Sequence, residues 1–378
     1  MKKTISKIMS CMTIAVIMGT TLICSTACDS REEIIVYNWG EYISEDDDST
    51  EEVEDTIALF EEAFPQYKVV YSTFETNETM YPNLDNTYDV IIPSEYMVCR
   101  LIGEERIQPL DWDLLPNVTK YMDPMFKDIS YSNDKKRSDE VLDYAIPYLY
   151  CTVGLVYDAN KIDLPEGTTD PEEIWGVVFD EANVGKIGMY DSMRESIGVA
   201  LNYLGYSINS MDKAELDAAK ELLISQKKEI RPAYGVDNLK DKMVSGELSA
   251  SVTWSGDHIV MLDRLEELGK EDVDLQFVLP EGSNWSIDMM CIPTNAKNVE
   301  GAHAFINFMY DPQIALYNCE FVGYSTPNTA ARDMLDPEVA NNIYYYPTSE
   351  VISTLEVYYT SSEIEEKYTD IWNTVGAN

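Results

Sequence analysis

Aromatic and acidic residues occur in short groups along this chain, and the first group follows an apolar run. In the stretch VYNWGEYIS, residues 36–44, the residues Trp39, Glu41 and Tyr42 lie within four positions. A carboxylate supplies the counter-charge that a cation needs when it leaves water. An aromatic face adds about 0.5–2 kcal/mol by cation–π attraction and can cover the methylene groups of an alkyl chain. The combination predicts one wall of a pocket for a small, positively charged molecule; the alternative is a surface turn with aromatic packing.

Similar side chains follow other predicted strands. Because ligands of open α/β sheets bind outside the carboxyl ends of the strands, we expect these side chains to converge. Several carboxylates along an aromatic slot suit a diamine or polyamine better than a single cation. The further candidates are Glu75, Asn77, Ser94, Glu95, Tyr96, Asp191, Glu195, Trp254, Asp257 and Asp288.

Charge and motifs argue against other functions. With 27 Lys and Arg against 68 Asp and Glu, the net charge is −41, so the chain would repel a nucleic acid. The sequence has no G-x-S-x-G, H-E-x-x-H or P-loop motif. With only His258 and His303 in the chain, a zinc site is not expected, and we predict no cofactor or metal. Paired carboxylates leave a surface glycoside hydrolase as an alternative from another class.

The elements that must position these residues alternate between strands and helices, which predicts βαβ units with parallel pairing. For the helix at 49–64, Ser49 and Glu52 form a predicted capping box, and Pro65 ends the helix. The predicted strands are 34–39, 67–74, 89–94, 153–158, 185–191, 250–257 and 287–293. The other predicted helices are 195–205, 213–228, 258–269 and 300–310.

The N-terminus has the pattern of an export signal. Three lysines precede an apolar stretch near residues 8–23, and small residues then precede a cysteine. The pattern resembles a bacterial lipoprotein signal, residues 1–27, with Cys28 as the lipidated residue and Cys24 as a competing candidate. We therefore expect an exported protein, tethered by lipid to the outer face of the cytoplasmic membrane.

Four further cysteines lie in apolar contexts, without a C-x-x-C motif. We interpret them as thiols of the hydrophobic core, and a disulfide between two of them is the alternative. They are Cys99, Cys151, Cys291 and Cys319.

The chain resembles the spermidine/putrescine-binding lipoproteins of polyamine ABC uptake systems. The resemblance runs from about residue 34 to 350, nearly the whole mature chain. The stretches that carry it are YNWGEYI, VVYSTFETNETMY, YDVIIPSEYMV, YAIPYLYCTVGLVYD, SMRESIGVALNYLGYS, IPTNAKNVEGAHAFINFM, GYSTPNTAARDML and YPTSE.

The resemblance implies a fold and an activity. Such proteins have a two-lobed, periplasmic-binding-protein-like α/β fold (type II), in which each lobe is a mixed, mostly parallel sheet flanked by helices. Lobe one would comprise residues 33–151 plus 286–333, and lobe two 152–285 plus 334–378. The protein would be a monomeric receptor, not an enzyme, that captures a polyamine between the lobes and delivers it to a membrane permease.

The resemblance also assigns ligand contacts. Asp288 occupies the position of the family's principal ligand-binding carboxylate, and Glu195 that of an ammonium-binding carboxylate of lobe two. Glu41 occupies the position of an acidic neighbour in lobe one. The aromatic and hydroxyl contacts are Trp39, Tyr42, Ser94, Tyr96, Trp254 and Tyr324.

Three departures from spermidine-preferring members concern the length of the ligand. Ser192 replaces an Asp, with Asp191 displaced by one residue, and Ser286 replaces an aromatic residue, with Trp285 displaced by one. In a strand such a shift turns the side chain to the other face, so Trp285 would not line the pocket. Asp257 resembles a carboxylate of putrescine-preferring members. Together these differences favour putrescine over spermidine, and a receptor for another small solute is the alternative.

Overall fold

A computed structural model describes residues 30–45, 54–132 and 134–377. The described residues from Glu32 onwards belong to one compact unit. The predicted signal segment, with Cys24 and Cys28, lies outside the described residues, as does the capping box of Ser49 and Glu52. Within the described residues, no helix combines the length and hydropathy needed to cross a membrane.

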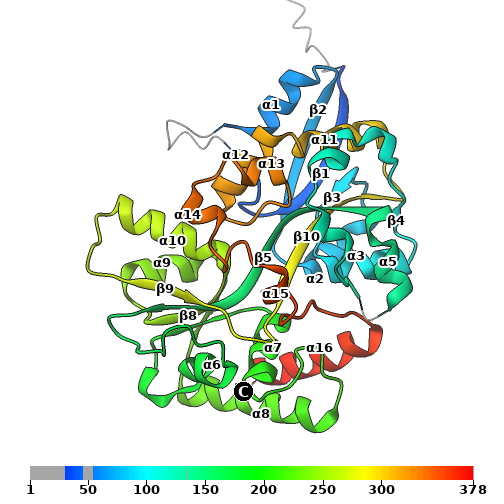
Figure 1. Ribbon diagram of the computed structural model, residues 1–378. Coiled ribbons are helices and arrows are strands. Elements are labelled where there is room, and N and C mark those ends of the chain that lie inside the picture. Colours follow the sequence, from blue (N-terminus) through cyan, green and yellow to red (C-terminus); the bar gives the residue numbers. More distant parts are fainter. Residues whose placement is uncertain (1–29, 46–53, 133, 378) are drawn as a thin grey trace, which may run out of the picture. The chain divides into compact units, whose positions relative to one another are not determined.

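The described strands form one mixed sheet in the order β2-β1-β3-β10-β5-β8-β6-β7, with β4 beside β10 and β9 beside β5. Pairing is parallel near both ends of this order, between β1 and its neighbours β2 and β3 and between β6 and its neighbours β7 and β8. Antiparallel β10 and β5 join the two parallel parts (Figure 1). The strands are β1 (Glu32–Trp39), β2 (Tyr67–Phe74), β3 (Val90–Ile91), β4 (Ile107–Gln108), β5 (Ala145–Asp158), β6 (Ile187–Tyr190), β7 (Ala233–Gly235), β8 (Ala250–Trp254), β9 (Leu275–Val278) and β10 (Trp285–Pro293).

The pairing of β10 with β5 contains a register shift between Asp288 and Met289. Asp288 pairs with Leu149, whereas Met289 pairs with Pro147, which has no backbone N–H to donate. The N–H of Met289 donates to the carbonyl of Pro93, at 2.8 Å. Irregularities of this kind re-aim a side chain. This one places Asp288 opposite Ser94 in an isolated bridge.

Helices lie between the strands along the chain, and the alternation predicted from the sequence is present. Helix α1 begins at an Asp55 cap, whose side chain accepts from the N–H of Ala58. The helices are α1 (Thr56–Ala63), α2 (Asn77–Met80), α3 (Glu95–Gly103), α4 (Pro116–Tyr121), α5 (Lys135–Tyr144), α6 (Pro171–Phe179), α7 (Met193–Tyr203), α8 (Lys213–Glu229), α9 (Asn238–Ser245), α10 (Ser255–Glu267), α11 (Val299–Met309), α12 (Pro312–Val322), α13 (Thr329–Arg332), α14 (Pro337–Ala340), α15 (Ser349–Ile352) and α16 (Ser362–Ala377). Short 3-10 helices are Tyr81–Asp85, Trp112–Leu114, Pro124–Lys127 and Glu181–Asn183.

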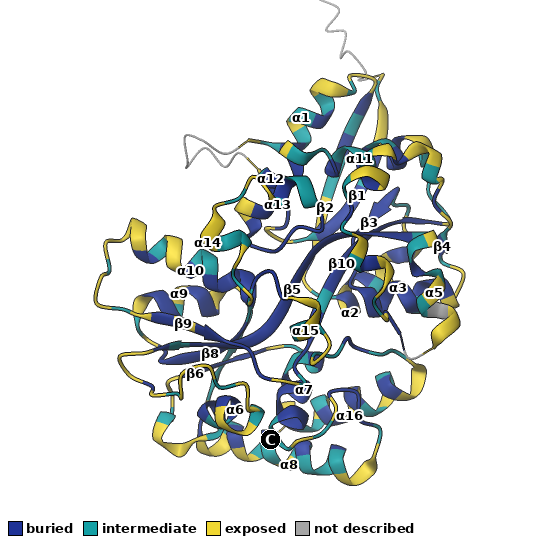
Figure 2. Cartoon of the chain, in the orientation of Figure 1, coloured by how far each residue is buried: buried dark blue, intermediate teal, exposed yellow. Residues whose placement is uncertain are grey.

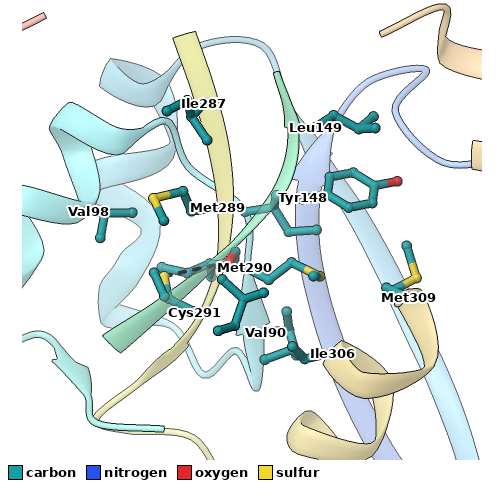
Figure 3. Packing of buried hydrophobic residues seen from close by; sticks show 14 of the residues in the cluster. Val90, Val98, Tyr148, Leu149, Ile287, Met289, Met290, Cys291, Ile306 and Met309 are labelled. Atoms are coloured by element: carbon teal, nitrogen blue, oxygen red, sulfur yellow. Dashed lines mark hydrogen bonds between the residues drawn. The ribbon is translucent and has the colours of Figure 1, made fainter. Parts of the chain in front are cut away.

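Buried apolar side chains form two clusters, which divide β5 between them. Cluster one contains buried residues of β5 up to Cys151, together with residues of β1, β3 and β10. Cluster two contains buried residues of β5 from Val153 onwards, together with residues of β6 and β8. The strands are buried along most of their length, and the helices expose one face (Figure 2). In cluster one, Met289, Met290 and Cys291 of β10 pack among side chains of α3, α11 and β5 (Figure 3).

All four cysteines of the described chain are buried, as predicted for core thiols. Cys151, Cys291 and Cys319 are reduced thiols, and the Sγ of Cys99 donates to the carbonyl of Tyr131 at 3.4 Å.

Candidate functional site

One cavity collects residues from β1, α2, α3, α7, β8 and β10, and therefore from both hydrophobic clusters. Eleven of the sixteen residues predicted for the site line it: Trp39, Tyr42, Glu75, Asn77, Ser94, Tyr96, Ser192, Glu195, Trp254, Asp288 and Tyr324. The other described residues that line it are Thr76, Glu78, Cys151, Val236, Ser286 and Tyr358.

Aromatic rings form a continuous wall across the cavity. Trp39 lies at the end of β1, and its ring centroid is 6.4 Å from that of Tyr42. Tyr42 contacts Tyr324 edge-on at 5.4 Å, and Tyr324 contacts Trp254 at 6.3 Å. Trp254 packs against both clusters, so the wall joins them. Trp39 is held in place because its Nε1 donates to the carbonyl of Ile92 at 2.8 Å.

A glycine allows Tyr324 to reach this wall. The ring of Tyr324 lies against Gly256 at the start of α10, where an added Cβ would stand 2.1 Å from the Cδ1 atom of the tyrosine. Gly256 thus provides the space in which the Tyr324 ring packs beside Trp254.

Asp288 is a buried carboxylate held by neutral donors. Its Oδ2 accepts from the hydroxyl of Tyr42 and its Oδ1 from the hydroxyl of Ser94, each at 2.7 Å. Asn77 supports this arrangement by donating to Ser94 Oγ at 3.0 Å. Burial raises the pKa of Asp288 to about 6, although the two hydroxyls lower it. A cation beside Asp288 would supply the counter-charge that these neutral donors lack.

Glu195 provides a second carboxylate, in the first turn of α7. The hydroxyl of Ser192 donates to its Oε2. Burial raises the pKa of Glu195, the hydrogen bond from Ser192 lowers it, and the negative charge of Glu78 raises it further. The site therefore concentrates negative charge from more than one element.

Cys151, in the middle of β5, is affected by the same negative charges. Burial raises the pKa of its thiol well above the usual value, and the charges of Asp288, Asp257 and Glu195 add to the effect. A thiolate is disfavoured here, so Cys151 contributes a small neutral surface to the cavity.

Besides Glu95, four predicted residues do not line the cavity. Asp257 is buried, and its carboxylate accepts from Tyr190 at 2.8 Å and lies 3.5 Å from the Lys240 ammonium. Trp285 packs in cluster one, 6.5 Å from the ring of Phe126, while the neighbouring Ser286 lines the cavity. Glu41, in a left-handed conformation with φ 50°, and Asp191 are exposed.

The residues that were not singled out from the sequence come from segments with no local signal for a site. Tyr358 lies between α15 and α16, and Cys151 belongs to the part of β5 that was not predicted as a strand. Glu75 and Asn77 follow β2 in the stretch ETNETMY, which also contains Glu78. The sequence indicated Glu75 and Asn77 by this position directly after a predicted strand, but it did not indicate Glu78.

Glu95 is a buried carboxyl directly behind the cavity. It is fully buried, and its Oε2 accepts from the N–H of Ile287 at 2.9 Å and the hydroxyl of Ser286 at 3.3 Å. Its Oε1 has no hydrogen-bond partner in the described part of the chain. Burial raises the pKa of Glu95 from 4.5 to about 8, the N–H of Ile287 lowers it, and the charge of Asp288 raises it. Glu95 is therefore protonated at neutral pH in the folded protein.

This protonation predicts a pH-dependent stability. Because folding raises its pKa, Glu95 stabilises the fold fully below pH about 4.5, and the contribution is lost as the pH rises towards 8. Glu95→Gln keeps a neutral side chain, so its free energy of unfolding relative to the wild type should rise between pH 5 and 8 by on the order of 3 kcal/mol. Urea unfolding at both pH values measures the difference; a constant difference would contradict the prediction.

Among the described residues, no group of three His, Cys, Asp or Glu side chains is arranged to hold a metal ion. The cavity offers aromatic surface, hydroxyl groups and carboxylates.

Comparison with known proteins identifies the family. A profile described as bacterial extracellular solute-binding protein matches residues 55–345. The chain belongs to this family. Among its solute-binding relatives, the spermidine/putrescine-binding periplasmic protein of Escherichia coli (strain K12) is 33% identical over 354 residues, which cover 90% of this chain and 91% of that protein. The putrescine-binding periplasmic protein SpuD of Pseudomonas aeruginosa (strain UCBPP-PA14) is 30% identical over 376 residues, 97% of this chain and 96% of that protein.

Solved structures of solute-binding proteins have the same fold. A putative spermidine/putrescine ABC transporter protein from Listeria monocytogenes is 34% identical, with a TM-score of 0.77 over 91% of this chain and 99% of that chain. The substrate-binding protein PotD of Streptococcus pneumoniae is 32% identical, with a TM-score of 0.71 over 92% and 99%. The predicted periplasmic-binding-protein-like α/β fold and the resemblance to the spermidine/putrescine-binding family are confirmed. These relatives are binding proteins of transport systems, so the prediction that the chain is not an enzyme is also confirmed.

Proposed function

We propose that this solute-binding protein captures a polyamine in the cavity and delivers it to the permease of an ABC transporter. One observation carries the proposal. The cavity is lined by four carboxylates and six aromatic residues, and none of its described lining residues is Lys, Arg or His. A site of this composition favours an aliphatic cation over an anion or a neutral sugar. The names of the polyamine-binding relatives support the same ligand class.

The mechanism that we propose is capture between two lobes, residues 33–151 plus 286–333 and residues 152–285 plus 334–378. Carboxylates would bind the ammonium groups while Trp39, Tyr42, Trp254 and Tyr324 cover the alkyl chain. Binding would shift the protein towards a closed form that the permease recognises. We further propose that the protein is a monomer, exported and anchored by lipid at Cys28.

Within the polyamines we propose putrescine over spermidine. The support is Ser192, where spermidine-preferring members carry a carboxylate. Asp257 gives no support, because Lys240 already provides its counter-charge.

Calorimetric titration with putrescine, spermidine and spermine tests the proposal. We expect micromolar or tighter binding of at least one polyamine, with putrescine bound most tightly, and no binding of a neutral sugar such as maltose. Absence of binding by all three polyamines at micromolar concentration would refute the ligand class. Tighter binding of spermidine would refute only the preference.

A further inference from the structure

Trp254 belongs to the aromatic wall of the cavity, and a tyrosine of the neighbouring strand β6 contacts it from outside the cavity. The last pair in the parallel ladder of β6 and β8 is Gly188 with Ser251. Beyond this ladder, the N–H of Trp254 donates to the hydroxyl of Tyr190 at 2.6 Å. The two rings also pack together, with their centroids 4.3 Å apart and an angle of 31° between their planes. Tyr190 therefore contacts both the backbone and the ring of Trp254.

The hydroxyl of Tyr190 is itself fixed by Asp257. It donates to the Oδ2 of Asp257 at 2.8 Å, and the hydroxyl of Thr253 donates to the same oxygen at 3.1 Å. A tyrosine hydroxyl has one hydrogen, so the bond to Asp257 leaves its oxygen free to accept from the N–H of Trp254. Asp257 lies in the first turn of α10, where the helix dipole stabilises a carboxylate.

A lysine of the protein supplies the counter-charge of this carboxylate. The Nζ of Lys240 lies 3.5 Å from the Oδ1 of Asp257 and 3.0 Å from the Oδ1 of Asp237. Burial lowers the pKa of this ammonium, but the charges of Asp257, Asp237 and Glu41 raise it above its usual value. The lysine is therefore charged at neutral pH, and Asp257 has a counter-charge and two hydroxyl donors without a ligand.

We propose that Tyr190, Asp257 and Lys240 form a positioning network for Trp254, and that Asp257 contributes to ligand binding only through this tryptophan. The inference rests on the proposed polyamine function and deepens it, because Trp254 belongs to the wall that would cover the alkyl chain. Neither Asp257 nor Tyr190 lines the cavity. A direct contact between Asp257 and an ammonium group, which the sequence suggested, would have to displace Lys240.

The network affects affinity because it orients the indole ring before the ligand arrives. A ring that is already held loses little conformational freedom on binding, whereas a ring that the ligand has to order costs affinity. For one side chain this cost corresponds to about a threefold to tenfold weaker affinity. Tyr190 is thus a positioning residue, and its effect on the ligand requires the ring of Trp254.

Tyr190→Phe tests the network, because it removes only the hydroxyl and leaves the net charge unchanged. We expect calorimetry to show putrescine binding weakened about threefold to tenfold. In a Trp254→Ala background, the same substitution should change the affinity by less than about twofold. Tyr368→Phe is the matched control, since this buried tyrosine of cluster two donates to the carbonyl of Ile208 at 2.8 Å and does not line the cavity.

The fluorescence of Trp254 gives a second measurement, without ligand. The contribution of Trp254 is the difference between the spectra of each protein and its Trp254→Phe counterpart. We expect Tyr190→Phe to change this contribution, because the hydroxyl that accepts from the tryptophan N–H is lost, and Tyr368→Phe to leave it unchanged. Melting temperatures above the assay temperature establish that the variants are folded.

The outcomes separate the inference from the proposed function. If the wild type binds no polyamine, the proposed function fails, whereas the fluorescence of ligand-free Tyr190→Phe still tests the network. If the wild type binds putrescine and Tyr190→Phe binds it equally well, the inference is overturned and the proposed function stands. Equal losses with and without the Trp254 ring would also overturn it, because the hydroxyl would then act on the ligand by another route. Unchanged fluorescence of Trp254 in Tyr190→Phe would overturn it as well.

Discussion

Asp288→Asn should weaken putrescine binding by about a hundredfold or more, the largest effect expected for a single side chain of the cavity. Asp288 is 7% exposed, and its carboxylate is bound only by the hydroxyls of Tyr42 and Ser94 among the described residues. Removing one partner of a buried, hydrogen-bonded charge pair costs about 2–5 kcal/mol, and each 1.4 kcal/mol is about a factor of ten in affinity. Calorimetry of the wild type and the variant measures the loss.

The pH dependence provides a second measurement of the same carboxylate. Because the pKa of Asp288 is about 6 without ligand, protonation should weaken putrescine binding as the pH falls through 6, while the ligand amines stay charged. Asp288→Asn should remove this part of the pH dependence. Asp113→Asn, at an exposed position outside the cavity, is the control. An unchanged affinity in Asp288→Asn would mean that the ammonium binds elsewhere.

Trp175→Ala should lower the free energy of unfolding by about 3–5 kcal/mol, as expected when a large buried side chain leaves a cavity. Trp175 is fully buried in cluster two. Its Nε1 donates to the side chain of Asn202 at 2.7 Å, so the substitution also removes a buried hydrogen bond. Urea unfolding followed by circular dichroism measures the change.

Leu268→Ala is the matched control for this truncation. Leu268 is 63% exposed, and its loss should change the free energy of unfolding by less than about 0.5 kcal/mol. Trp175 does not line the cavity, so the folded variant should still bind putrescine. A loss of less than about 1 kcal/mol for Trp175→Ala would mean that cluster two rearranges to fill the space.

Periodicity predicted the regular elements closely. The helix predicted at 213–228 is α8 (Lys213–Glu229), and the one at 300–310 is α11 (Val299–Met309). The strand predicted at 67–74 is β2. In these segments the spacing of apolar and polar residues along the sequence indicates which side chains are buried.

The sequence reading failed where long-range pairing decides the structure. The first part of β5 contains Pro147, and a proline argues against a central strand. This part of β5 was therefore not predicted as a strand. In the fold, the pairing of β5 with β10 shifts register next to this proline, and β5 continues past it. The pairing partner, more than a hundred residues away in the chain, is the reason that no local pattern indicates it.

For the site, the sequence by itself determined which residue types are available: aromatic rings and carboxylates after strands, and a negative net charge without a basic patch. The tertiary structure decided which of these carboxylates remain open to a ligand. Asp257 and Asp288 look alike in the sequence, but Asp257 lies beside Lys240, whereas Asp288 is held by two hydroxyls. The physical reason is that a buried carboxylate needs a counter-charge, and only the packing of distant segments decides whether the protein supplies it or leaves it to a ligand.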